Sequence, residues 1–361
     1  MNRFSHKKVF RPALLFFTFL FLTSAHLSGC GNASPGNSQI KDSDSSKPAS
    51  DKQGSNKQVS KTSFFLNTVV TITLYGTEDD SLIEECFRLC DEYEKTLSRT
   101  LEGSEIYALN HRTASTVSDE TLSLIETGLK YSALSDGALD ITIGSCSSLW
   151  DFTAETPSLP DKAALSESLA HVGYEKLSLN GNTVSFSDDQ TLIDLGAIAK
   201  GYIADRLKDF LVENGVTSAI IDLGGNVLCI GDKPDGSPFR IGIQKPFDPQ
   251  GTPMLVVPVS DRSVVTSGIY ERYFEEDGKL YHHILDPATG YPCENNLLSV
   301  TILSEHSVDG DALSTACFSL GLDRGMDLID SLDEIYAVFI TDDYEVHYSE
   351  GLLERFAISG P

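Results

Sequence analysis

Apolar residues after residue 60 follow two spacings, alternation and a three-to-four-residue repeat. Alternation among β-branched and aromatic residues predicts strands, and the three-to-four-residue spacing predicts helices. The predicted strands cover residues 69–75, 177–179, 183–186, 191–195, 218–223, 226–230, 239–244, 254–259, 280–285, 297–304, 336–340 and 345–348. The predicted helices cover residues 80–97, 118–135, 196–214 and 308–322, with a shorter helix after the last one.

Turn residues join some of these strands directly. Asn180-Gly181 separates two predicted strands, which is a strong hairpin signal, and Gly224-Gly225 separates another two. Strands outnumber helices and often pair with their sequence neighbours, so the pattern predicts an α+β fold rather than a doubly wound sheet. A Gly-x-Gly-x-x-Gly signature is absent, and a Rossmann fold therefore has no support.

The N-terminus has the pattern of an export signal. Arg3, Lys7, Lys8 and Arg11 form a basic head, and an apolar run follows at residues 13–22. That run is too short for a transmembrane helix, which needs roughly 20 apolar residues, whereas a basic head with a short apolar core is typical of a signal peptide.

The signal segment ends in Leu27-Ser28-Gly29-Cys30, which resembles the lipobox of bacterial lipoproteins. The resemblance implies a signal peptide at residues 1–29, cleavage before Cys30 and acylation of its thiol. An ordinary secretory signal with a chance cysteine is the alternative. The polar stretch at residues 30–60 is expected to be a disordered tether, which leaves residues 61–361 as the folded domain.

Charge limits the partners of this domain. The formal net charge is -26, and removing the four cations of the signal segment takes it to about -30 (-26 minus 4). So acidic a chain is not expected to bind nucleic acid or an anionic membrane surface. An anionic ligand would need a metal, a helix N-terminus or a few placed cations. Six cysteines follow Cys30 without a zinc-type spacing, and apolar neighbours indicate buried thiols.

Two stretches place oxygen ligands or cations at helix starts. In residues 192–202, Asp194 ends a predicted strand and Lys200 falls in the first turn of a helix, where free N–H groups attract anions. A solvated lysine after an ordinary turn is the alternative. Asp311 and Thr315 are four residues apart and share a helical face, which suits a hard cation such as Mg²⁺. Alternatively, Asp311 caps its own helix.

A third stretch combines histidine with a turn. His282 and His283 precede Asp286-Pro287-Ala288-Thr289-Gly290, which is a turn by its chemistry. A histidine here could act as a base or as a polar contact near phosphate, although a lone histidine is more often structural. Further polar fragments lie at residues 97–100, 104–110 and 135–142.

In their order along the chain and in their amino-acid sequence, these stretches resemble the ApbE-type FAD:protein FMN transferases. The resemblance covers residues 65–321. Its specific elements are Gly137-Ala138-Leu139-Asp140, residues 194–202, Asp222-Leu223-Gly224-Gly225-Asn226, Thr266-Ser267-Gly268, residues 283–290 and residues 311–315.

The resemblance implies a T-fold-like α+β architecture, FAD as substrate and Mg²⁺, or alternatively Mn²⁺, as cofactor. The implied metal-site residues are Ala197, Asp311, Ser314 and Thr315. The implied FAD contacts are Leu66, Thr100, Ala138, Leu139, Asp140, Asp194, Lys200 and Leu285. His283 and Lys200 would serve catalysis. The family's usual Met-Gly-Thr reads Leu66-Asn67-Thr68 here, and Thr100 aligns with a usual aromatic residue.

The implied reaction moves FMN from FAD to a threonine or serine hydroxyl of an exported or membrane protein, and AMP leaves. The family's targets carry a Ser/Thr-Gly-Ala-Thr-like motif, which this chain lacks. The protein is expected at the cell membrane, lipid-anchored and facing outward. Two alternatives stay open: a Mg²⁺-dependent FAD pyrophosphatase with water as acceptor, and a lipid-anchored solute-binding protein. Release of AMP from FAD would separate enzyme from binder.

Overall fold

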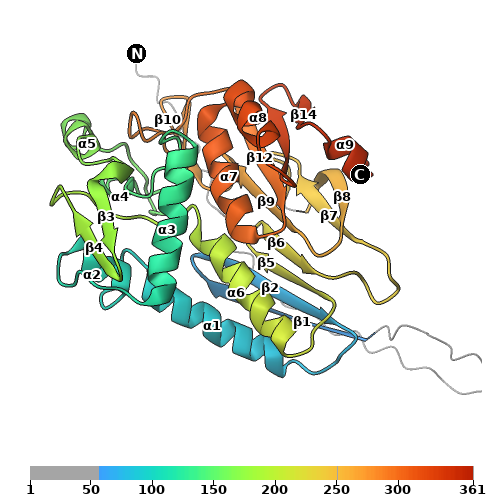
Figure 1. The fold of residues 1–361 in the computed structure, drawn as a ribbon. Helices are drawn as coiled ribbons and strands as arrows, with labels where there is room; N and C mark the ends of the chain where they lie inside the picture. Colours follow the sequence, from blue (N-terminus) through green and yellow to red (C-terminus); the bar gives the residue numbers. More distant parts are fainter. Residues whose placement is uncertain (1–56, 250, 361) are drawn as a thin grey trace, which may run out of the picture. The chain divides into compact units, whose positions relative to one another are not determined.

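The computed structural model describes residues 57–249 and 251–360 (Figure 1). The predicted signal segment, Cys30 and most of the predicted tether lie outside these residues. The strands are β1 Gln58–Phe65, β2 Thr68–Tyr75, β3 Leu177–Asn180, β4 Thr183–Phe186, β5 Ala219–Leu223, β6 Asn226–Ile230, β7 Phe239–Gln244, β8 Pro253–Val259, β9 Ser263–Gly268, β10 Tyr273–Glu276, β11 Lys279–His282, β12 Leu297–Ser304, β13 Tyr336–Thr341 and β14 Val346–Tyr348. The helices are α1 Ser81–Leu97, α2 Glu105–Asn110, α3 Asp119–Leu134, α4 Gly144–Ser147, α5 Lys162–Leu169, α6 Ala199–Glu213, α7 Ser307–Leu320, α8 Leu322–Asp330 and α9 Leu352–Arg355.

An antiparallel sheet organises the fold. Its strands run in the order β1-β2-β5-β6-β9-β12-β13-β14, and each neighbouring pair is antiparallel. Pairs β3-β4, β7-β8 and β10-β11 form separate hairpins. The α+β expectation is therefore confirmed, because no parallel pair of named strands occurs among the described residues.

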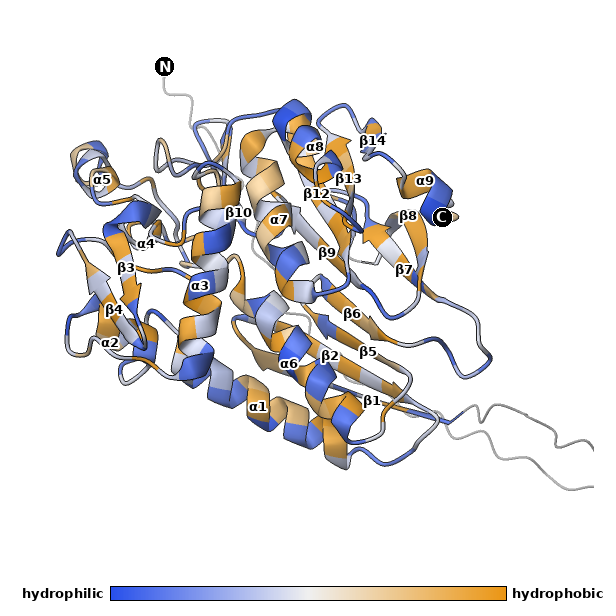
Figure 2. Cartoon of the chain, in the orientation of Figure 1, coloured by the Kyte–Doolittle hydropathy of each residue, from blue (hydrophilic) through white to orange (hydrophobic). Residues whose placement is uncertain are grey.

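Both faces of the sheet are covered. Helices α1, α6, α7 and α8 pack on one face, and α1 carries bands of hydrophilic and hydrophobic residues, as an amphipathic helix does (Figure 2). Alternate residues of a strand point to opposite faces. Accordingly Val300 and Ile302 of β12 join the core under the helices, whereas Leu303 joins a second core with the β7-β8 hairpin. Leu298 also joins the second core, because a register irregularity between Leu297 and Ser299 interrupts the alternation.

Three strand predictions need correction. Strand β1 begins at Gln58, inside the stretch expected to be a tether and ahead of the predicted domain start at Lys61. The expected strand at residues 191–195 is absent, because Leu192 makes only an isolated bridge to Ile143. Strand β11 ends at His282 rather than at residue 285, because the chain turns there toward the Asp286 loop. Strands β9 and β10 and several short helices were not predicted.

The expectation of buried thiols is confirmed. Cys86, Cys90, Cys146, Cys229, Cys293 and Cys317 are all buried and unpaired. Burial raises the pKa of the Cys86 thiol to about 12, with smaller additions from Cys90 and Glu85, so this thiol is protonated and unreactive at neutral pH. Among the described residues, none of the helices is long and apolar enough to cross a membrane.

Candidate active site

Helices α6 and α7 cross at Gly201. A Cβ added there would lie 2.3 Å from the carbonyl oxygen of Ser307 and 2.6 Å from the Cα of Val308. Only glycine lets the backbones approach this closely. The contact places the first turn of α6 against the first turn of α7, and thus brings together the two helix starts that the sequence marked as candidate sites.

The start of α7 is capped by a side chain of α6. His306, its N-cap residue, makes no side-chain cap bond. Instead, Asp205 accepts hydrogen bonds from the backbone N–H groups of Ser307 (2.8 Å) and Val308 (2.9 Å). Burial raises the pKa of Asp205 to about 6, although both N–H donors favour the charged form. A carboxylate at a helix N-terminus also interacts favourably with the helix dipole.

The start of α6 is capped in turn by α7. Asp311 is 2% exposed, and its Oδ2 accepts the Gly201 N–H at 2.9 Å. A continuing helix would direct that N–H to the Ala197 carbonyl, four residues earlier, and that bond is not made. The Lys200 Nζ lies 3.2 Å from Asp311 Oδ1. The hypothesis that Asp311 caps its own helix is therefore wrong, because its carboxylate caps the neighbouring helix.

Two hydroxyl groups of α7 lie one helical turn after Asp311 and bond its backbone carbonyl. The Ser314 and Thr315 side chains donate to the Asp311 carbonyl at 3.0 and 3.3 Å. Ser267 of β9 lies 2.9 Å from Ser314 Oγ and 3.3 Å from Thr315 Oγ1. The predicted pair Asp311/Thr315 thus shares one face of α7 with Ser314. Its donors are all oxygens, the type that a hard cation prefers.

Sequence reasoning missed Glu271, which follows β9 and faces this cluster. Desolvation by the surrounding protein raises the pKa of Glu271 to about 7; Lys200 and Arg272 oppose the rise, and Asp311 adds to it. The side chain also keeps exposed surface. Glu271 therefore lies near enough to Lys200 and Asp311 for both charges to act on its carboxyl.

His283 is held beside the same segment. The ring Nδ1 of His283 lies 3.3 Å from the Arg272 carbonyl oxygen. The backbone N–H of His283 donates to the same oxygen at 3.1 Å. Because a carbonyl can only accept, we assign the ring proton to Nδ1, which leaves Nε2 as an acceptor. Burial, with help from Arg272, His282 and Lys200, lowers the pKa of His283 to about 3. The imidazole is therefore neutral at pH 7. His282 is structural, since its Nε2 bonds the Cys293 carbonyl.

Asp194 is fixed by partners far away in the sequence. Its Oδ2 lies 3.0 Å from Arg99 Nε and accepts from Ser147 Oγ at 2.6 Å. Its Oδ1 accepts the Gly196 N–H at 2.9 Å. Sequence reasoning missed Arg99 and Ser147. Only the polar fragment at residues 97–100 pointed toward Arg99, and nothing in the sequence linked either residue to Asp194.

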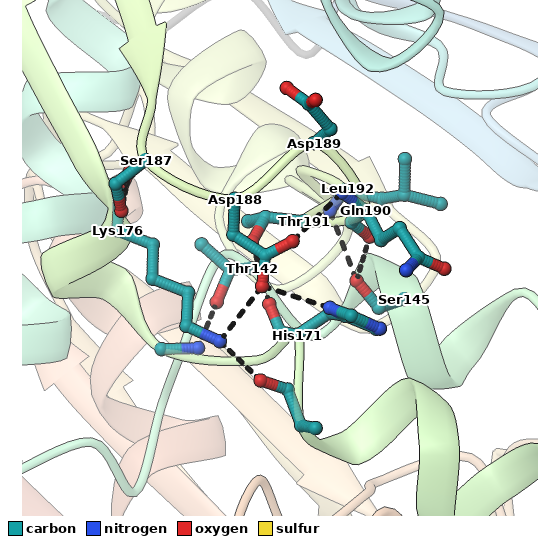
Figure 3. Close-up of polar contacts among 12 residues, drawn as sticks. Thr142, Ser145, His171, Lys176, Ser187, Asp188, Asp189, Gln190, Thr191 and Leu192 are labelled. Atoms are coloured by element: carbon teal, nitrogen blue, oxygen red, sulfur yellow. Dashed lines mark hydrogen bonds and ion pairs between the residues drawn. The ribbon is translucent and has the colours of Figure 1, made fainter.

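The segment before Asp194 is clamped by the polar network of Figure 3. His171 Nδ1 and Lys176 Nζ lie 2.8 and 3.3 Å from Asp188 Oδ2, and the His171 bond chiefly lowers the pKa of Asp188 to about 2. Ser145 Oγ donates to the Gln190 carbonyl at 3.0 Å and accepts the Leu192 N–H at 3.1 Å. These side-chain contacts replace the strand pairing that was expected here.

Asp140 supports its own loop. It is 6% exposed and accepts from the Thr142 N–H (2.7 Å), the Thr142 hydroxyl (2.6 Å) and the Tyr174 N–H (2.9 Å). Burial raises its pKa despite these bonds. Leu139 is buried beside it and Ala138 is half-buried. The Asp194 N–H donates to the Ile141 carbonyl at 2.7 Å, so this loop and Asp194 are joined directly.

The other predicted contact residues are less enclosed. Leu66 is half-buried in the two-residue turn between β1 and β2 with φ 55°, a backbone region unusual for leucine. Thr100 is exposed next to Arg99. Leu285 is half-buried and forms an isolated bridge with Pro292.

Comparison with known proteins gives one consistent result. The sequence model of the ApbE family matches residues 66–339. The chain is 37% identical over 303 residues to a FAD:protein FMN transferase of Klebsiella pneumoniae (strain 342), covering 82% of this chain and 94% of that protein. It is 35% identical over 321 residues to the FAD:protein FMN transferase of Treponema pallidum (strain Nichols), covering 83% and 89%.

Solved structures agree with the sequence comparisons. The flavin transferase ApbE from Vibrio cholerae superposes with a TM-score of 0.74 at 30% identity, covering 82% of this chain and 99% of that chain. The ApbE protein from Thermotoga maritima superposes with a TM-score of 0.75 at 31% identity, again covering 82% and 99%. The antiparallel sheet and its packed helices are thus shared with these proteins.

Proposed function

The chain belongs to the ApbE family and is a FAD:protein FMN transferase, and from that premise we propose that it transfers FMN to a threonine or serine hydroxyl of an exported or membrane-bound protein. The bond that forms joins the acceptor oxygen to the FMN-side phosphorus of FAD. The bond that breaks is the pyrophosphate P–O bond, and AMP leaves. The observation that carries the proposal is that Asp311, Thr315 and Lys200 come together at the crossing of α6 and α7, with His283 near enough to Lys200 for that cation to help lower its pKa.

The donor set at this crossing fits Mg²⁺ or Mn²⁺. The proposed ligands are the Asp311 carboxylate, the Thr315 hydroxyl and the Ala197 carbonyl, which the Gly201 N–H leaves free, with Ser314 adjacent. Among the described residues, no three His, Cys, Asp or Glu side chains cluster as metal ligands. A single carboxylate suits Mg²⁺, which keeps coordination sites for water and phosphate oxygens. When bound, the cation would neutralise negative charge on the pyrophosphate.

Lys200 and His283 take the polar roles in the transfer. Lys200 lies in the first turn of α6, where its ammonium and the helix start attract phosphate oxygens. His283 is neutral, and its free Nε2 would accept a hydrogen bond from the attacking hydroxyl and so steer that hydroxyl toward the phosphorus. FAD would reach the site past Asp194, the loop carrying Ala138, Leu139 and Asp140, and the half-buried positions Leu66, Thr100 and Leu285.

The same reaction with water as acceptor is FAD hydrolysis. This alternative uses the same residues, and only the acceptor distinguishes it. The alternative of a lipid-anchored solute-binding protein is no longer supported. The relatives are transferases, and a solute-binding role does not account for the capped helix pair. For location, we keep the proposal that acylated Cys30 anchors the domain at the outer side of a membrane.

The direct test incubates the protein with FAD, Mg²⁺ and an exported flavoprotein domain that carries a Ser/Thr-Gly-Ala-Thr-like motif. Intact-mass spectrometry reports the added mass of FMN on the domain, and chromatography reports AMP. We expect both products in equal amounts. AMP and free FMN without modified domain would favour the hydrolase, and no AMP would contradict both enzymatic assignments.

A further inference from the structure

Three aromatic side chains from separate parts of the chain are exposed close together. Phe247 lies in the β7-β8 loop, Tyr273 begins β10 and Tyr344 lies between β13 and β14; they are 42%, 41% and 39% exposed. The rings of Phe247 and Tyr273 lie 5.6 Å apart. The Tyr344 hydroxyl donates to the carbonyl of Pro246, the residue before Phe247, at 3.3 Å. We call these three residues the aromatic patch.

The loop that carries Phe247 is held in place before any partner arrives. The Gln244 amide lies within 3.0 to 3.2 Å of the carbonyl oxygens of Lys245, Asp248 and Pro249. Phe247 itself has φ 62°, a left-handed conformation that non-glycine residues keep only where the surrounding structure enforces it. An exposed phenylalanine held this way loses little conformational entropy on binding.

The patch adjoins the candidate active site through four consecutive residues. Phe247 packs edge-on against Tyr270, with ring centroids 6.1 Å apart. The next residue, Glu271, faces Lys200 and Asp311, and Arg272 holds His283 through its carbonyl. Tyr273 then returns to the patch. In this short segment, Glu271 and Arg272 therefore adjoin the site. Tyr270 packs against the patch, and Tyr273 belongs to it.

Resting on the proposed function, we propose that the aromatic patch is the docking surface for the folded acceptor protein. The acceptor hydroxyl has to reach the site beside Glu271 and His283, so the surface next to that segment becomes an interface with protein during every transfer. Tyrosine and phenylalanine are enriched at the centres of such interfaces. The patch would hold the body of the acceptor while its modified residue enters the site.

The test measures binding separately from transfer. The probe is the acceptor domain of the transfer assay with its target threonine replaced by valine, so that it binds without reacting. The double variant is Phe247→Asn with Tyr273→Thr, because asparagine tolerates the left-handed backbone and threonine suits a strand. Phe64→Thr, which removes a 65% exposed aromatic side chain of β1, is the matched control. Isothermal titration gives the affinities for the probe and for FAD.

We expect the double variant to bind the probe at least about tenfold more weakly, the loss typical of central interface aromatics, while FAD affinity stays within twofold. The Phe64→Thr control should match the wild type in both. Equal affinity of wild type and double variant for the probe would overturn the proposal, as would no binding by the wild type. A parallel loss of FAD affinity would instead show that the patch stacks on the flavin. Transfer to the unmodified domain, measured independently, decides the proposed function.

Discussion

Replacing Asp311 by alanine should destabilise the metal-free protein, because this carboxylate caps α6. The buried Gly201 N–H would lose its acceptor, and an unsatisfied buried donor costs about 1–3 kcal/mol. Lys200 would lose its partner as well, but its side chain is 26% exposed, so water offsets much of that loss. The sum is about 2–3 kcal/mol, which lowers the Tm by roughly 3–5 °C for a domain of this size.

Asparagine at the same position separates the two roles of Asp311. Its amide oxygen can still accept the Gly201 N–H, so Asp311→Asn should keep most of the stability. The Asp311→Asn variant lacks the negative charge, however, and Asp311 is the only charged ligand proposed for the cation. Asp311→Asn should therefore abolish FMN transfer at ordinary Mg²⁺ concentrations although the protein remains folded.

The assay follows unfolding by circular dichroism in the presence of a chelator, and FMN transfer as a function of Mg²⁺. Asp209→Ala, which removes an exposed carboxylate on α6, serves as the control and should leave both readouts unchanged. An Asp311→Ala protein that unfolds at the wild-type temperature would refute the capping argument. An Asp311→Asn protein with wild-type transfer and Mg²⁺ dependence would refute the metal assignment.

Three further outcomes are expected. His283→Asn should slow transfer strongly and leave FAD affinity nearly unchanged; a comparable loss of both would make His283 a ligand-holding residue. Burial raises the pKa of Asp205 to about 6, so its stabilising contribution is complete below the unfolded pKa near 3.9 and is lost as the pH rises through 6. Urea titrations should show that Asp205→Asn removes this change, which amounts to roughly 1.4 kcal/mol per pH unit within that window; an unaltered pH profile would contradict the assignment. Cys30→Ala should keep transferase activity but no longer partition into detergent with membrane proteins, and continued partitioning would rule out the lipid anchor.

Elements with a strong hydrophobic period were predictable, and those supported by their neighbours were not. Helices α1, α3, α6 and α7 carry apolar stripes at helical spacing and end within a few residues of the predicted positions. Strand β1 has a polar sequence because it is an edge strand, exposed at alternate positions and paired only with β2. Its polar composition alone resembles a linker, and only the pairing makes it a strand.

The reverse happened at residues 191–195. The apolar side chains there favour a strand, yet the backbone groups are taken by Ser145, Asn110 and Arg112 instead of a neighbouring strand. Such side-chain partners compete with ladder hydrogen bonds, and they come from positions that no local pattern connects to this segment. The result is an irregular segment that precedes Asp194 and is held by side-chain hydrogen bonds from these three residues.

At the candidate site, too, features set by the local sequence were predictable and contacts between distant residues were not. The spacing of Asp311 and Thr315 and the position of Lys200 at a helix start are local properties, and the sequence predicted both. The bonds from Arg99 to Asp194 and from Asp205 to Ser307 join residues about a hundred positions apart, and spacing within an element cannot reveal them. Glu271 was missed for a related reason: the charges that act on it include Lys200 of α6 and Asp311 of α7, whereas Glu271 itself lies in the turn between β9 and β10.

The reciprocal caps explain why this helix pair is a suitable place for the proposed cation. Asp205 holds the start of α7 and Asp311 holds the start of α6, so neither carboxylate is free to rotate. A cation would therefore meet a ligand that is already oriented, and little side-chain entropy would be lost on binding. Within the described part of the chain, the cation that pairs with Asp311 Oδ1 is the Lys200 ammonium at 3.2 Å, and a metal ion would compete with it. Displaced from Asp311, Lys200 would still lie in the first turn of α6, where a pyrophosphate is drawn by the helix start. The helix crossing that stabilises the fold would thus also supply two positive groups, the cation and Lys200, to the pyrophosphate.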